Sequence, residues 1–145
     1  MIGMTGGRQG ISIGSGCEKR GIVEHEIGHA LGLWHEQSRP DADNYITVQP
    51  ANIIKSMISN FLQRFVLILR RLQRVFYLSS WNDVTSFKNP YDLGSIMHYG
   101  PTAFTNDWTK YTIVTKDKDY QRTIGQREKL SFYDYKTINN AYCKG

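Results

Sequence analysis

Cysteine and long apolar runs are both scarce in this chain of 145 residues. It holds only two cysteines, Cys17 and Cys143, and the simplest interpretation pairs them in one disulfide. No apolar run approaches the roughly 20 residues of a membrane-spanning helix, and residues 1–16 lack the basic and apolar regions of a signal peptide. Apolar residues still make up 40% of the chain, which favours a folded globular domain over disorder.

Acidic residues are missing from one stretch, and this explains most of the net charge of +5. Residues 61–80 contain four arginines and no acid, whereas the rest of the chain is close to neutral, which argues against a nucleic-acid-binding surface. Apolar residues of the stretch fall at helical spacing, opposite the arginines: Phe61, Leu62, Phe65, Leu69, Leu72 and Phe76. This pattern predicts a basic amphipathic helix over residues 61–78, typical of helices that bind a membrane surface or a partner protein.

Histidine is also rare, but the four histidines of the chain are concentrated in two motifs. Residues 25–35 read H-E-x-x-H-x-x-G-x-x-H. His25 and His29 lie four positions apart, so on a helix they project from the same face one turn apart. Gly32 can end that helix in a left-handed conformation, after which the chain presents His35. Three imidazole ligands leave the fourth tetrahedral position of a zinc ion open, as in catalytic sites.

Glu26 follows the first predicted ligand directly and is the candidate general base. Zinc lowers the pKa of a bound water to about 7, and Glu26 would accept its proton as the oxygen attacks a peptide carbonyl. The alternative is an ordinary amphipathic helix with surface histidines, since four apolar residues supply a suitable face: Val23, Ile27, Ala30 and Leu31.

A second motif, Ser95-Ile96-Met97-His98-Tyr99, lies between Gly94 and Gly100-Pro101, which predicts a tight turn. A long histidine motif followed by such a methionine turn is the metzincin pattern. Together with residues 36–41 (EQSRPD), and with Gly125-Gln126-Arg127 ahead of Leu130-Ser131, the chain resembles the astacin family of zinc endopeptidases. The resemblance covers residues 5–62 and 80–143.

This resemblance implies roles for further residues. Met97 would form an apolar floor beneath the metal, and Tyr99 would be both a ligand of the resting metal and a stabiliser of the transition state. Glu36 would anchor the mature N-terminus, and His98 would be structural. Residues 9–14 would form an edge strand that pairs with an extended peptide or protein substrate.

The resemblance also implies a single α+β domain over residues 1–145, a metzincin-like catalytic domain with an incomplete N-terminal subdomain and one zinc ion per chain. Residues 1–36 would be the remnant of the N-terminal subdomain, with the edge strand and the zinc helix. Residues 37–145 would form the C-terminal subdomain. Residues 65–79 have no counterpart in the family and are interpreted as an atypical insertion. The glycines and prolines within residues 79–127 predict loops and short strands there.

In the family each of the two cysteines matches one half of a different disulfide, with both partners upstream of the present Met1. The chain is therefore interpreted as part of a secreted protein. The leading hypothesis is a zinc endopeptidase. The alternatives are a defective fragment, in which the zinc helix lacks the support of the missing sheet, and a module that binds a membrane or partner through the arginine-rich helix. A membrane partner is not favoured, and the sequence leaves the oligomeric state open.

Three helices are expected from periodicity and capping residues, besides the basic one. The zinc helix should span residues 18–31 and a short helix residues 51–58. A last helix is expected over residues 131–141, where Ser131 and Asp134 suit the first turn.

Overall fold

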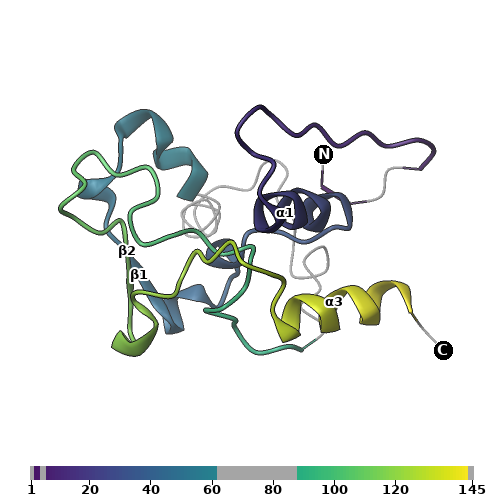
Figure 1. Ribbon diagram of the computed structural model, residues 1–145. Helices are drawn as coiled ribbons and strands as arrows, with labels where there is room; N and C mark the ends of the chain where they lie inside the picture. The colour runs from purple at the N-terminus through teal and green to yellow at the C-terminus, as the bar shows by residue number, and fades with distance from the viewer. Residues whose placement is uncertain (1, 4–5, 62–87, 144–145) are drawn as a thin grey trace, which may run out of the picture.

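In the computed structural model, the described part of the chain has two α-helices beside a small antiparallel sheet (Figure 1). The structure describes residues 2–3, 6–61 and 88–143. Its regular elements are α1 (Arg20–Ala30), β1 (Ile46–Val48), β2 (Ile113–Thr115) and α3 (Phe132–Tyr142). The two strands pair with Ile46 opposite Thr115 and Val48 opposite Ile113. The expected α+β class is confirmed, and the expected zinc helix and last helix are present with ends shifted by one or two residues.

Short 3-10 helices connect these elements: η1 (Glu36–Ser38), η2 (Ala42–Asn44), η3 (Pro50–Asn52), η4 (Lys55–Phe61) and η5 (Lys118–Tyr120). The expected α-helix over residues 51–58 is wrong, because η3 and η4 replace it. Ile53 forms a β-bridge with Thr105, and the amide of Ile54 donates to the carbonyl of Phe104 at 2.9 Å. Pairing with this distant segment takes the backbone donors that a continuous helix would have used.

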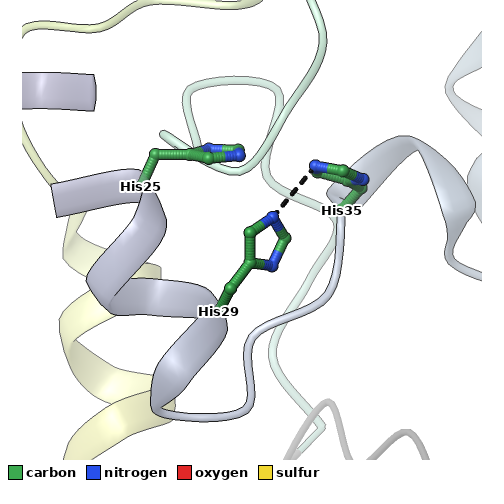
Figure 2. A group of neighbouring side chains, drawn as sticks. All are labelled: His25, His29 and His35. Carbon is green, nitrogen blue, oxygen red and sulfur yellow. Dashed lines mark hydrogen bonds between the residues drawn. The ribbon is translucent and has the colours of Figure 1, made fainter. Parts of the chain in front are cut away.

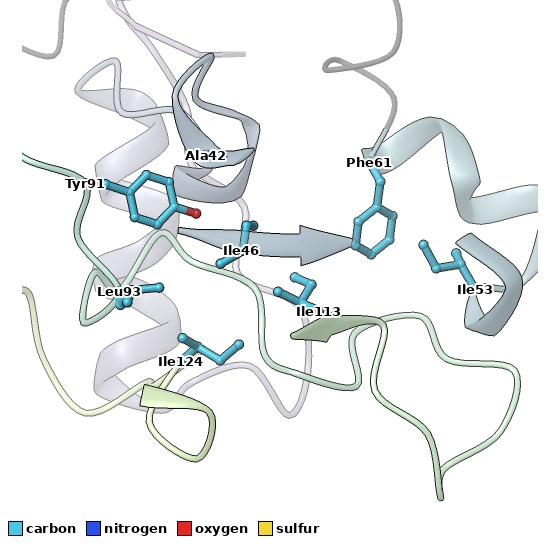
Figure 3. Packing of buried hydrophobic residues seen from close by; sticks show 8 residues of the cluster. All are labelled: Ala42, Ile46, Ile53, Phe61, Tyr91, Leu93, Ile113 and Ile124. Carbon is cyan, nitrogen blue, oxygen red and sulfur yellow. The ribbon is translucent and has the colours of Figure 1, made fainter. Parts of the chain in front are cut away.

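The hydrophobic core gathers side chains from segments far apart in the sequence (Figure 3): Ala42, Ile46, Ile53, Phe61, Tyr91, Leu93, Ile113 and Ile124. Each large apolar side chain removed from water stabilises the fold by about 1.5–3 kcal/mol. Tyr99 packs against this cluster and also contacts the histidine motif, so the core fixes one wall of the candidate site.

The expected strand over residues 9–14 is wrong. Residues 8–14 follow an irregular path over α1 (Figure 1), and Ile11 is 46% exposed. A strand forms only when a neighbouring strand takes up its backbone hydrogen bonds, and no other described segment pairs with this one.

Cys17 and Cys143 are both exposed free thiols, so the simplest interpretation, a disulfide between them, is wrong. The predicted basic helix beyond Phe61 and the insertion at 65–79 lie outside the described residues. Within the described residues no helix has both the length and the apolar character that crossing a membrane requires.

The start of α3 is fixed by a capping box, as Ser131 and Asp134 predict. The Ser131 hydroxyl accepts from the Asp134 amide at 3.0 Å, and Asp134 Oδ2 accepts from the Ser131 amide at 2.9 Å. The same buried carboxylate also accepts from the Ser95 hydroxyl at 2.7 Å and the Ile96 amide at 3.0 Å. Asp134 therefore ties α3 to the turn that carries the second histidine motif.

Replacing Asp134 by alanine should lower the free energy of unfolding by about 3 kcal/mol, because it removes a helix cap and leaves buried donors without partners. Urea denaturation measures the change. The side chain of the exposed Asp119 makes no hydrogen bond within the described residues, so Asp119→Ala is the matched control. Equal losses in the two variants would contradict this assignment.

Candidate metal centre

The relative positions of the three histidines depend on where α1 ends. Gly32 has φ +98°, a conformation that costs glycine little and other residues more. Its amide donates to the His29 carbonyl at 3.0 Å, and the Leu33 amide donates to the Gly28 carbonyl at 2.9 Å. This glycine-ended turn reverses the chain and returns His35 to the helix face that carries the other two histidines.

The three histidines of the motif converge in space (Figure 2). His25 and His29 project from α1, and His35 faces them from the segment that follows. One ligand atom from each lies within 4.8 Å of the other two, and the Nε2 atoms of His29 and His35 are 3.1 Å apart. Two nitrogens at about 2.0–2.1 Å from a tetrahedral zinc ion would stand about 3.3 Å apart. The spacing therefore suits a shared metal ion.

Backbone carbonyls set the tautomers of the two helical histidines. His25 Nδ1 donates to the Ile96 carbonyl at 2.8 Å, and His29 Nδ1 donates to the Leu33 carbonyl at 2.9 Å. A carbonyl can only accept, so the proton of each neutral ring lies on Nδ1 and the lone pair on Nε2. These orienting partners were missed from the sequence, since a backbone carbonyl carries no residue signature.

The charge state of the histidines also suits a cation. Burial lowers the pKa of His25. Burial, reinforced by the neighbouring His29 and His25, lowers the pKa of His35 to about 3. Both rings are thus neutral at pH 7, the form that ligates metals.

The close contact between two of the rings shows whether the donor set fits zinc. A His29 ring with its proton on Nδ1 offers the Nε2 lone pair toward His35 Nε2, 3.1 Å away, and either a proton of His35 or a shared cation can lie between the two atoms. Three imidazole nitrogens match the preferences of Zn²⁺, whereas Mg²⁺ and Ca²⁺ take oxygen ligands. The residues present therefore fit zinc. The surface-histidine alternative does not hold, because His25 is only 8% exposed while Ile27 of the supposed apolar face is 40% exposed.

Tyr99 borders the metal centre beside His35, with a ring-centre separation of 4.6 Å. Burial raises the pKa of its phenol, so the hydroxyl keeps its proton at neutral pH. Its ring also packs edge-on against Phe61 and Phe104, at 5.6 and 5.5 Å. Neither phenylalanine was predicted as a site residue, because these contacts arise only in the folded chain.

Glu26 and His29 line an open depression of about 170 Å³ together with residues 9–12. The N-terminal segment therefore borders the candidate general base, although it does not form the expected strand. Glu26 follows His25 on α1 and lies at the wall of this depression.

Met97 lies buried under α1, a position compatible with the apolar floor that the family resemblance implies. It is 1% exposed, and a Cβ placed on Gly28 would come within 2.8 Å of its sulfur. Its carbonyl accepts from the Glu36 amide at 3.2 Å. Gly28 occupies an unspecified position of the H-E-x-x-H motif and was missed from the sequence.

Glu36 is held in a polar cluster behind the histidines. Its Oε1 accepts from the Asp92 amide at 2.7 Å and pairs with Arg39 Nη1 at 3.0 Å. Burial raises the pKa of Glu36 to about 7, although the Arg39 charge opposes the shift. Together with the buried Asn89, whose Oδ1 has no hydrogen-bond partner within the described residues, it lines a cavity of about 190 Å³.

His98 is fully buried and does not belong to the metal-binding group. Its Nδ1 donates to the Tyr99 carbonyl at 2.7 Å, and its Nε2 accepts from the Tyr91 hydroxyl at 2.8 Å. Burial lowers its pKa to about 4. These contacts support the structural role expected from the sequence.

Three features define the metzincin class of metal centre. A helix presents two histidines, a glycine turn returns a third, and a methionine turn lies beneath them. The family model described as Astacin, a family of peptidases, matches residues 1–143. The chain therefore belongs to the astacin family.

Individual relatives agree with this assignment. The chain is 57% identical over 145 residues to the zinc metalloproteinase nas-36 of Brugia malayi, covering 100% of this chain and 22% of the relative. It is 58% identical over 144 residues to nas-36 of Caenorhabditis elegans, covering 99% and 21%. High choriolytic enzyme 1, a hatching enzyme zinc-protease from the medaka Oryzias latipes, matches in structure with a TM-score of 0.66 and 33% identity, covering 85% of this chain and 52% of that one. The chain spans about a fifth of the length of the curated relatives it matches.

Gly28→Ala should weaken zinc binding and destabilise the fold by about 1–3 kcal/mol, because the new methyl group overlaps the Met97 sulfur under the ligand helix. Zinc titration with a competing chelator and thermal unfolding measure the two effects. Gly14→Ala is the control, since its added Cβ would meet no atom within 4 Å. Unchanged zinc affinity in Gly28→Ala would contradict the packing argument.

Stability should fall in acid partly through His98. The unfolded chain binds a proton on His98 near pH 6.5 and the folded chain only near pH 4, so this contribution is fully present above 6.5 and is lost between 6.5 and 4. Between pH 7 and pH 5 the zinc-free protein should lose about 2 kcal/mol more unfolding free energy than His98→Gln. Urea denaturation at a series of pH values measures the difference, and parallel profiles would contradict it.

Proposed function

We propose that this chain is the metal-binding core of a zinc endopeptidase that hydrolyses peptide bonds in extended peptide or protein substrates. The observation that carries the proposal is the convergence of three imidazoles beside a glutamate on an open surface. Membership of the astacin family supports the same conclusion.

His25, His29 and His35 would hold the zinc through their Nε2 atoms. Bound there, zinc supplies a Lewis acid that acidifies water and polarises the substrate carbonyl. Two observations support these assignments. Burial lowers the pKa of both His25 and His35, and backbone carbonyls fix the tautomers of His25 and His29.

Glu26 would take the proton of the attacking water and return it to the departing amine. Tyr99 would donate its hydroxyl to the oxygen that gains negative charge. Its raised pKa supports a donor role at neutral pH, and its packing on His35 supports a place beside the metal, where the family resemblance also makes it a ligand of the resting site.

An extended substrate would lie along residues 9–12, which border Glu26 and offer backbone groups for strand-like pairing. Within the proposed division, residues 1–36 carry this border and all three histidine ligands, and residues 37–145 carry Met97 and Tyr99. By family resemblance the whole protein would be secreted.

Glu36 would anchor the amino group of a mature N-terminus. The cavity beside it supports this role, since Asn89 Oδ1 and the Glu36 carboxylate both offer acceptors to an ammonium group.

Glu26→Gln should reduce kcat/KM for peptide cleavage at least a hundredfold, because the amide cannot accept the proton of the attacking water. About one zinc per chain should remain bound, since Glu26 is not a proposed ligand. His25→Ala is the contrasting variant and should lose both zinc and activity. Metal analysis and cleavage of a quenched fluorescent peptide measure these outcomes. Comparable turnover in Glu26→Gln and the parent would refute the proposed mechanism.

A second candidate is a zinc-binding fragment without turnover. The 40% exposure of Ile27 on α1 and the missing strand at residues 9–14 favour it, because both indicate a helix without its full support. Stoichiometric zinc with no detectable cleavage in the parent protein would select this candidate.

A further inference from the structure

The proposed mechanism assigns no role to the motif Gly125-Gln126-Arg127. This motif forms a strap that lies between the methionine turn and α1. Gly125 has φ +78°, and a Cβ placed on it would lie 2.2 Å from Gly100 Cα and 3.0 Å from the carbonyl carbon of Tyr99. The backbone of the strap therefore touches the chain directly at Tyr99.

The other two strap residues reach both neighbouring segments. A Cβ on Gly21 would lie 1.8 Å from the Arg127 carbonyl oxygen, so the strap backbone packs against the first turn of α1. Gln126 Nε2 donates to the Gly94 carbonyl at 2.9 Å. Arg127 Nη1 donates to the His98 carbonyl at 3.1 Å and to the Gln126 carbonyl at 2.8 Å.

The guanidinium of Arg127 is half-buried and interacts electrostatically with Tyr99 and with Glu26, which lie on different segments. Within the described residues no carboxylate pairs directly with this charge, which acts at longer range on Tyr99 and Glu26 and also on the histidines nearby. Partial burial reduces the screening of such a charge by solvent.

We propose that Arg127 is a positioning residue, which holds the His98–Tyr99 backbone against α1 and thereby places the Tyr99 hydroxyl beside the metal centre. Its catalytic consequence rests on the proposed peptidase function. Three polar contacts fix this part of the turn: Gln37 Oε1 accepts from the Tyr99 amide at 3.1 Å, His98 Nδ1 donates to the Tyr99 carbonyl at 2.7 Å, and Arg127 donates to the His98 carbonyl.

Of these three contacts, that of Arg127 is the one that joins the turn to α1, because the same residue packs on Gly21. Without the guanidinium, the turn keeps its contacts with α1 at Ile96 and Met97, but the His98–Tyr99 backbone loses the side-chain bond that ties it to the strap, so Tyr99 is held less firmly. A displacement of about 1 Å in a catalytic group can cost about a hundredfold in rate.

The test compares Arg127→Met with Arg127→Lys and with Arg122→Met, a control that removes the same charge from an exposed position. In zinc-loaded Arg127→Met, hydrogen exchange at the Tyr99 amide should be at least about tenfold faster, while exchange within α1 and the zinc content stay unchanged. For cleavage, kcat should fall about tenfold to a hundredfold with KM within about twofold of the parent. Arg127→Lys should recover part of both effects, and Arg122→Met should match the parent.

A double-mutant cycle with Tyr99→Phe decides whether Arg127 acts through Tyr99. The loss of kcat caused by Arg127→Met should shrink markedly in the Tyr99→Phe background. Full additivity would overturn the proposal, as would unchanged exchange at Tyr99. A raised KM at constant kcat would also overturn it, because that result places the guanidinium in contact with substrate.

Two further outcomes remain decisive. If Arg127→Met does not fold or loses its zinc, Arg127→Lys decides, since it keeps the charge and a single donor; parent-like exchange and kcat in that variant would overturn the proposal. If the parent binds zinc but cleaves nothing, the proposed function fails. The exchange measurement then still tests whether Arg127 positions Tyr99.

Discussion

The geometry of the metal centre depends on two hydrogen bonds from histidine Nδ1 atoms to backbone carbonyls. The Ile96 carbonyl orients His25, and the Leu33 carbonyl orients His29. These carbonyls come from different segments, so the ring orientations are correct only when the methionine turn and the chain after Gly32 are both in place. The fold therefore builds the site by bringing two turns to one face of a helix. In the unfolded chain no comparable preorganised donor set exists, which couples metal binding to folding.

The turn that carries Met97 and Tyr99 is fixed from several directions. Asp134 holds it from α3, Gly28 allows the Met97 sulfur to approach α1, and the strap at Arg127 closes it from the far side. Most of these contacts involve backbone groups or glycines. Where two backbone segments approach closely, the side chains that they carry have little freedom to move. A chain with few regular elements can therefore still fix the geometry of its site.

The sequence predicts the metal centre better than the fold around it, for a physical reason. The spacing of His25, His29 and Gly32 follows from helix geometry, which is local, and the capping box of α3 is equally local. By contrast, residues 9–14 needed a partner strand and residues 51–58 were diverted by pairing with Phe104 and Thr105, so periodicity alone predicted the wrong element. The roles of Gly28 and Arg127 come from tertiary contacts that no spacing rule contains.

The two exposed thiols of Cys17 and Cys143 have a practical consequence for handling this protein. In air they can join separate molecules covalently, so purification calls for a reductant. Small dithiols are themselves soft chelators and would compete with imidazoles for the zinc ion. A phosphine reductant suits this protein better, because it keeps the sulfurs reduced without offering thiolate ligands to the metal.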